Sequence, residues 1–191
     1  MLLALAVTLL WGAVSLQEQD DLARKMIRLH VIANSDNEAD QTLKLQVRDK
    51  VLTLTEDTLR QSADMTDAEV KLTAALPKIQ AAAQQEIMAR GYDYPVKAEL
   101  VPASFPTKDY DGFSLPGGDY TALRLTIGEG EGHNWWCVVF PPLCVSAAEQ
   151  DRALDAMSGD VRGIISDDGG RVIRFRIVEL WGELTRLIGV V

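Results

Sequence analysis

The chain has 191 residues, of which 47% are apolar and 25% are charged, and its formal net charge is −9. These proportions are those of an ordinary globular protein rather than of a disordered chain. The acidic balance argues against nucleic-acid binding, because proteins that bind phosphate backbones need a cluster of lysine and arginine. The length is sufficient for one domain with a hydrophobic core and a terminal extension.

The first 16 residues, MLLALAVTLLWGAVSL, form an apolar run that gives way to the polar stretch QEQDD. The run is shorter than the roughly 18–20 residues of a membrane-spanning helix. It suits the apolar part of a secretory signal peptide, with Ala13 and Ser15 as a small-x-small cleavage site, although no Lys or Arg precedes it. We expect residues 1–16 to be a signal peptide or a membrane anchor, and residues 17–191 to form a single α+β domain. A buried N-terminal helix is the alternative for the apolar run.

The first predicted elements are a strand and a helix joined by a polar turn. Apolar side chains alternate over Ile27–Ile32, which predicts a strand. The following helix has an apolar face built on leucines seven residues apart, and Ser35 or Asp36 is placed to cap its start. Asp40 and Lys44 fall on the opposite face, in the order that favours an ion pair.

A second helix is predicted to follow directly. It begins at Thr66 or Asp67, and its helical spacing of apolar residues ends at Gly91, a predicted C-cap. Pro77 lies inside this pattern and is expected to kink or split the helix.

The second half of the chain is predicted to be mainly strands. Alternation begins at Tyr94 and returns at Tyr120–Ile127, and Trp135–Phe140 is an almost unbroken apolar run. Short connections favour antiparallel neighbours. A strand over Val172–Ile177 and a helix over Val178–Ile188 are expected to follow. The fold class is α+β, with an antiparallel or mixed sheet packed by two long helices on one face.

Two polar patterns resemble ligand sites but have simpler interpretations. The run Gly128–Asn134, GEGEGHN, leads into a strand, whereas a phosphate-binding loop must lead into a helix. We interpret it as a hairpin loop. Asp36, Glu38 and Asp40 alternate like calcium ligands but lack the central glycine, so capping of the helix explains them better. The sequence therefore predicts no metal and no cofactor.

The two cysteines, Cys137 and Cys144, allow three interpretations. An even number of cysteines in an oxidising compartment favours a disulfide, whereas two buried free thiols are the alternative. Cys137 could also be the nucleophile of a cysteine hydrolase, with His133 or His30 as its base. Residues four apart in a strand lie about 13 Å from each other, so His133 could serve only if its loop folded back.

Two longer segments carry a resemblance to a known family. The first is LHVIANSD at residues 29–36, continued by Asp40-Gln41, Leu43-Lys44 and Val47-Arg48-Asp49. The second is GxGxGxNWWCV at residues 128–138, continued by FPPLC at residues 140–144. In content, order and separation the two segments resemble the stage II sporulation protein R family.

The resemblance implies a signalling protein that a forespore exports into the space between forespore and mother cell. There it would activate the membrane-embedded aspartic peptidase that processes the precursor of sigma factor E, without being an enzyme itself. A secreted cysteine hydrolase acting on cell-wall peptide, or a structural protein of the septal envelope, is the alternative. Helix capping is the alternative role of the polar turn. The candidate partner-binding residues are His30, Asn34, Asp36, Arg48, Asp49, Asn134 and Trp135.

Overall fold

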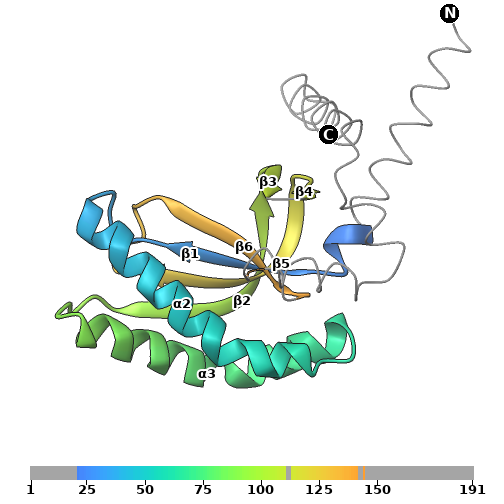
Figure 1. The fold of residues 1–191 in the computed structure, drawn as a ribbon, viewed down its shortest axis with the longest axis horizontal. Coiled ribbons are helices and arrows are strands. Elements are labelled where there is room, and N and C mark those ends of the chain that lie inside the picture. The colour runs from blue at the N-terminus through green and yellow to red at the C-terminus, as the bar shows by residue number, and fades with distance from the viewer. Residues whose placement is uncertain (1–20, 111–112, 142–143, 145–191) are drawn as a thin grey trace, which may run out of the picture. The chain divides into compact units, whose positions relative to one another are not determined.

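The computed structural model describes residues 21–110, 113–141 and 144, which fall into two compact units (Figure 1). The larger unit holds residues 25–103 and the described residues from 120 onward, and the smaller holds residues 21–24 and 104–119. The predicted signal peptide or anchor and the predicted C-terminal strand and helix lie outside the described residues. Within the described ranges, no helix has both the length and the hydropathy of a membrane span.

A four-stranded mixed sheet is the framework of the larger unit. The strands are β1 (Ile27–Ile32), β2 (Val96–Phe105), β5 (Gly118–Ile127) and β6 (Asn134–Phe140), in the order β2-β5-β1-β6. β1 runs parallel to β5 and antiparallel to β6. The predicted α+β class is therefore confirmed.

The expectation that the successive strands β5 and β6 are neighbours is wrong, because β1 lies between them. The connection after β5 crosses the end of β1 and bonds to it. Gly132 N donates to Ala33 O at 3.0 Å, and Glu131 N donates to Asn34 O at 3.1 Å. These bonds place the chain at the edge of β1 that faces away from β5, where β6 begins. They also leave β1 in the interior of the sheet, where its apolar residues Ile27, Leu29 and Val31 are fully buried.

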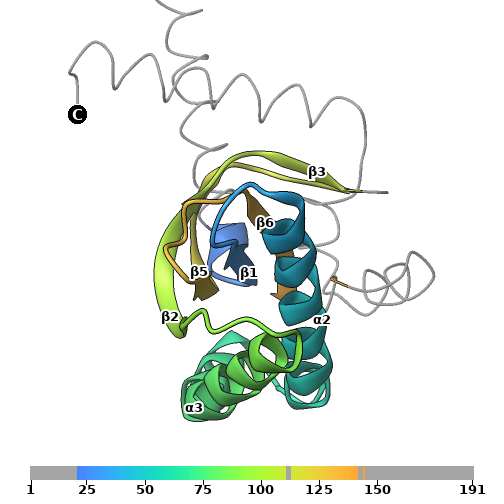
Figure 2. The same ribbon diagram turned by 90° about the vertical axis from the view of Figure 1, so that its left-hand side faces the viewer.

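Two helices, α2 (Glu38–Arg60) and α3 (Met65–Ala89), pack on one face of this sheet (Figure 2). Each large aliphatic side chain that is fully buried between the layers stabilises the fold by about 1.5–3 kcal/mol. The core that they form with the sheet includes Leu29 and Val31 of β1, Leu43, Val47 and Val51 of α2, and Leu72, Ile79 and Ile87 of α3.

The helix ends differ from the predicted ones. Asn37, rather than Ser35 or Asp36, caps α2, because its side-chain oxygen accepts the bond from Asp40 N at 2.7 Å. Asp64 caps α3 one residue before the helix starts. The helix then continues through Pro77 without splitting, and Pro77 lies on its exposed side.

The outer edge of β2 is covered by glutamines from α3. The Gln84 side chain accepts a bond from Val96 N at 3.1 Å and donates to Tyr94 O at 2.9 Å, while Gln80 accepts one from Ala98 N at 3.0 Å. Further along the same alternation, Pro102 has no N–H to offer. This edge therefore presents few donors to another strand, which protects it from edge-to-edge pairing.

The smaller unit contains a short antiparallel hairpin of β3 (Lys108–Tyr110) and β4 (Phe113–Leu115). No strand is predicted between the alternating segments here, because these residues are dense in proline, glycine and aspartate. Strands of three residues are too short to show a clear alternation.

Candidate partner-binding face

The two segments that carry the family resemblance fold against each other. Five successive pairs join β1 to β6, from Arg28↔Val138 to Ile32↔Asn134. Beyond the strands, the loop before α2 meets the loop before β6 (Figure 1). α2 then runs alongside β6. We call the line where they meet the α2–β6 seam; it is formed by Asp36, Lys44, Arg48, Asp49, His133 and Trp135.

Asn34 joins the two loops to the start of α2. Its side-chain amide donates to Asp40 Oδ2 at 2.8 Å, and its side-chain oxygen accepts a bond from Glu129 N at 3.0 Å. One half-buried side chain thus links its own loop to two other parts of the chain. The structure gives this predicted partner-binding residue a positioning role.

Asp40 is the centre of this arrangement, with only 2% of its surface exposed. Its Oδ2 atom accepts bonds from Asn34, from Ser35 Oγ at 2.7 Å and from Asn37 Nδ2 at 3.1 Å. Burial opposes the ionisation of this carboxyl group. Hydrogen bonds from Asn34, Ser35, Tyr94 and Asn37 outweigh that cost, so the pKa of Asp40 is lowered.

Lys44 is also buried, and it connects α2 to β6. Its Nζ atom donates to Gln41 Oε1 at 2.6 Å and to His133 O at 2.8 Å. Burial lowers the pKa of Lys44, partly against the nearby charge of Asp36. The predicted exposed ion pair between Asp40 and Lys44 is therefore wrong: both side chains point inward, and each binds loop groups instead.

The glycines of the GEGEGHN run allow it to lie close to the loop before α2. A Cβ atom on Gly128, where φ is +57°, would lie 2.1 Å from Asn34 Oδ1, and one on Gly132 would lie 2.3 Å from Ser35 O. The run leads into β6 rather than a helix. Its glycines therefore serve the close approach of two backbones, and no helix N-terminus is present there to hold a phosphate.

The outer part of the seam begins with an aspartate and a histidine. Asp36 Oδ1 accepts a bond from His133 N at 2.6 Å, and the His133 ring nitrogen Nδ1 bonds the same oxygen. The bond from the ring is the main cause that lowers the pKa of Asp36. Both side chains are more than half exposed. No cluster of metal-ligating side chains is found in the described part of the chain.

The middle of the seam is an arginine stacked on a tryptophan. The Arg48 guanidinium lies 4.2 Å from the centre of the Trp135 ring, and its Nε donates to Asp49 Oδ1 at 2.8 Å. Such a stack contributes about 0.5–2 kcal/mol. Trp135 Nε1 is enclosed and has no hydrogen-bond acceptor among the described residues. Arg48, Asp49 and Trp135, all predicted partner-binding residues, are thus brought together.

Two predicted residues lie elsewhere. His30 Nε2 and Asn134 Oδ1 are 2.7 Å apart, and His30 is paired in the sheet with Trp136. Neighbouring residues of a strand point to opposite faces, so this group lies on the face turned away from α2 and Trp135. Burial lowers the pKa of His30, against the bond to Asn134.

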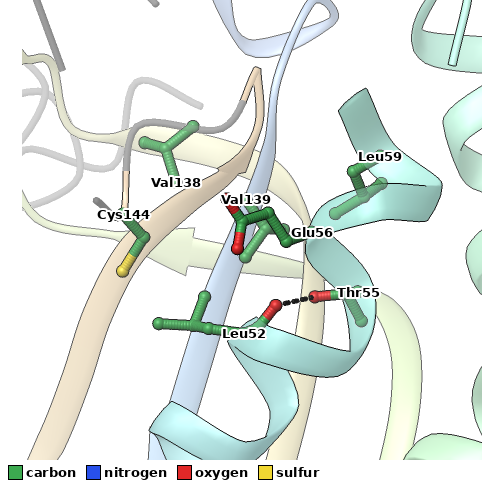
Figure 3. A pocket seen from close by; sticks show the side chains of 7 residues that line it. All are labelled: Leu52, Thr55, Glu56, Leu59, Val138, Val139 and Cys144. Carbon is green, nitrogen blue, oxygen red and sulfur yellow. Dashed lines mark hydrogen bonds between the residues drawn. The ribbon is translucent and has the colours of Figure 1, made fainter. Parts of the chain in front are cut away.

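The seam ends at a small hollow of about 30 Å³ between α2 and β6 (Figure 3). Cys144 lies beside this hollow and forms a disulfide with Cys137, with their Cα atoms 5.6 Å apart. The disulfide leaves neither sulfur as the thiolate that a cysteine hydrolase would need. The other lining residues are Leu52, Thr55, Glu56, Leu59, Val138 and Val139.

Sequence reasoning missed Gln41 and Lys44 as site residues, and it considered His133 only as a catalytic base. Gln41 Nε2 donates to Ser35 O at 2.9 Å, and Lys44 Nζ donates to His133 O, so both side chains hold the two loops next to the seam in place. Both residues belong to the first segment that resembles the family, and this membership is the sequence feature that could have identified them.

We expect Gly132→Ala to destabilise the larger unit by about 3 kcal/mol, because the new methyl group would overlap the Ser35 backbone. Gly91→Ala is the matched control. Its Cβ meets open space, so only the φ of +84° opposes it, at about 1 kcal/mol. Urea unfolding at neutral pH measures both costs. Equal losses would show that the two loops are not closely packed.

We expect Asp40 to make folding sensitive to acid. Because its folded pKa is lowered, its contribution is complete above the ordinary value of 3.8 and is lost as pH falls through the folded pKa. Asp40→Asn should cost about 1–3 kcal/mol at pH 7 and flatten the loss of unfolding free energy in acid. The control is Asp49→Asn, an exposed acid on the same helix. If Asp40→Asn kept the parent's pH slope, the hydrogen bonds would not stabilise the charged form.

Comparison with known proteins supports the family assignment. The family model described as stage II sporulation protein R matches residues 23–150. Stage II sporulation protein R of Bacillus subtilis (strain 168) is 38% identical over 118 residues. That match covers 62% of this chain and 53% of the relative, so it spans about half of the relative's length. No solved structure matches. The chain belongs to the stage II sporulation protein R family.

Proposed function

We propose that this protein is an activating ligand of sporulation that uses the α2–β6 seam to bind a membrane-embedded aspartic peptidase. The forespore would export it to the space facing the mother cell, where the peptidase processes the precursor of sigma factor E. The observation that carries the proposal is the convergence of both family segments on one seam. Catalysis would belong to the peptidase, not to this protein.

The seam suits recognition of a protein partner because it is held in place before binding. Its two loops are held by hydrogen bonds that involve Asn34, Asp40 and Lys44. Little conformational entropy is therefore lost on association. A ligand activates only if it binds the active form of its partner more tightly than the resting form. A rigid seam can make that distinction, since it fits one arrangement of the partner's surface.

Arg48 and Trp135 are the expected centre of the contact. Tryptophan and arginine are enriched among residues whose loss costs most in protein interfaces. The enclosed Trp135 N–H would gain a bond if a partner displaced Arg48 and offered a carbonyl oxygen. The exposed Asp36 and Asp49 would lie at the rim, where charges mainly affect the rate of association.

Export is supported by two features of the chain. Residues 1–16 have the composition of a signal peptide's apolar run. The disulfide between Cys137 and Cys144 suits an oxidising space outside the cytoplasm.

We expect Trp135→Leu to reduce processing of the sigma factor precursor at least about tenfold at limiting protein, equivalent to about 1.4 kcal/mol of binding. Leucine keeps apolar volume at the seam but removes the ring and its N–H. The measurement is an immunoblot of precursor cleavage in membranes that contain the peptidase, after addition of purified full-length protein.

Trp136→Leu is the matched control for this experiment. It makes the same change one residue later, on the opposite face of the sheet, and should leave processing near the parent level. Thermal melting verifies that both variants are folded. A folded Trp135→Leu protein that activates as well as the parent would exclude the seam, as would equal losses in the two variants.

The double variant Cys137→Ser, Cys144→Ser separates a ligand from a cysteine hydrolase. We expect it to lose about 2–4 kcal/mol of stability with its disulfide. It should still activate processing at a temperature where circular dichroism shows it folded. Complete loss of activity in the folded double variant would favour the hydrolase.

A further inference from the structure

We propose that the centre of the α2–β6 seam binds a carboxylate side chain of the protein partner, an aspartate or a glutamate. This inference rests on the proposed function and names the chemistry that the seam recognises. Three hydrogen-bond donors carry it, because none of them has a full set of acceptors among the described residues. They are Trp135 Nε1, the Arg48 guanidinium and Lys44 Nζ.

The indole N–H of Trp135 is the first of these donors. Its Nε1 atom is enclosed, and no described residue offers it an acceptor. A buried donor without an acceptor costs free energy, so a partner group that supplies one gains affinity from it. The Arg48 guanidinium lies 4.2 Å from the centre of the same ring. A group that bonds the Trp135 N–H therefore comes close to a positive charge.

Arg48 is paired with an acid that a partner can replace. Its Nε and Nη2 atoms both contact one oxygen of Asp49, Oδ1, at 2.8 and 2.7 Å. Asp49 is the next residue of α2, and successive helix residues do not face each other. The Asp49 side chain is 63% exposed, so this pair contributes little to stability. A carboxylate that uses both oxygens on the guanidinium makes two parallel bonds, which are stronger.

Lys44 adds a second positive charge one helical turn before Arg48, about 6 Å along the axis. It is only 4% exposed, and its ammonium group donates to the neutral oxygens of Gln41 and His133. Two of its three N–H groups are thus used, and no described carboxylate is paired with it. Burial lowers the pKa of Lys44 against the charge of Asp36, and the charge of Arg48 lowers it further. The two cations repel each other, so an anion beside Arg48 stabilises both.

Together these donors favour a carboxylate over a neutral oxygen or a phosphate. A backbone carbonyl would satisfy Trp135 but leave the repulsion between Lys44 and Arg48 in place. A phosphate monoester carries about −1.5 to −2 charges, and the exposed acids Asp36 and Asp49 oppose it more strongly than they oppose a single charge. A carboxylate has one charge and two oxygens, which suffice for the Trp135 N–H and for Arg48.

The test uses isotope-labelled full-length protein and two probes that differ by one group, N-acetylglutamate methylamide and N-acetylglutamine methylamide. We expect the NMR signal of the Trp135 indole N–H to shift when the glutamate probe is added in the millimolar range. The apparent affinity should be at least about tenfold higher than for the glutamine probe. Loss of the signal in Trp135→Leu assigns it. The indole signal of Trp136, on the opposite face of the sheet, is the internal control and should not shift.

Three variants separate recognition of a carboxylate from a structural role. Arg48→Gln should remove the response to the glutamate probe. Asp49→Asn should raise the affinity for that probe by about threefold, because it removes the competing acid. A loss of structure would not produce such a gain. Lys50→Gln is the matched control, since Lys50 is an exposed cation on the opposite side of α2 from Arg48, and it should leave the response unchanged.

Equal responses to the two probes would overturn the proposal. So would a stronger response to inorganic phosphate, or an affinity that Asp49→Asn leaves unchanged. The precursor-processing assay with Trp135→Leu tests the proposed function separately. If that variant loses processing while the parent protein does not respond to the glutamate probe, the seam binds its partner through other chemistry. If the parent responds to the probe while Trp135→Leu processes normally, the proposed function fails instead.

Discussion

The structure of the candidate site depends on one buried carboxylate. An isolated buried charge is too costly to persist, so the Asp40 side chain requires hydrogen bonds wherever it lies. Asn34, Ser35 and Asn37 supply them from a single short loop. The loop is held in one conformation because several of its side chains bond the same oxygen. A helix start and a loop conformation are thus determined together.

The loop before α2 in turn positions the loop before β6, about a hundred residues later in the sequence. The Asn34 side chain bonds Glu129 N, while Ala33 O and Asn34 O accept bonds from Gly132 N and Glu131 N. These contacts bring the chain to the outer edge of β1, and Lys44 then bonds His133 O at the start of β6. The strand order and the α2–β6 seam therefore share one cause. The proposed recognition of one form of a partner would require such rigidity.

Periodicity predicted the elements well and their arrangement poorly, for identifiable reasons. The strands and helices predicted within the described residues have runs long enough to show alternation or helical spacing, and the structure confirms them; it also contains the short hairpin of β3 and β4, which was not predicted. The cap of α2 was misassigned because three successive polar residues can each accept the first amide bond. Asp40 points inward because it bonds the loop directly before the helix, and Lys44 does so because it bonds His133 O, which is distant in sequence. Helical spacing shows neither contact.

The family resemblance identified both segments that form the seam. Only the alternation of side chains along each strand shows which of their residues lie on which face of the sheet. His30 alternates with the core residue Leu29, so its place on the other face, beside Trp136, follows from the sequence. The same alternation places Asn134 on the face of His30 and Trp135 on the opposite face. Arg48 and Trp135 come from different segments, and their stacking became visible only when the register of β1 and β6 was known.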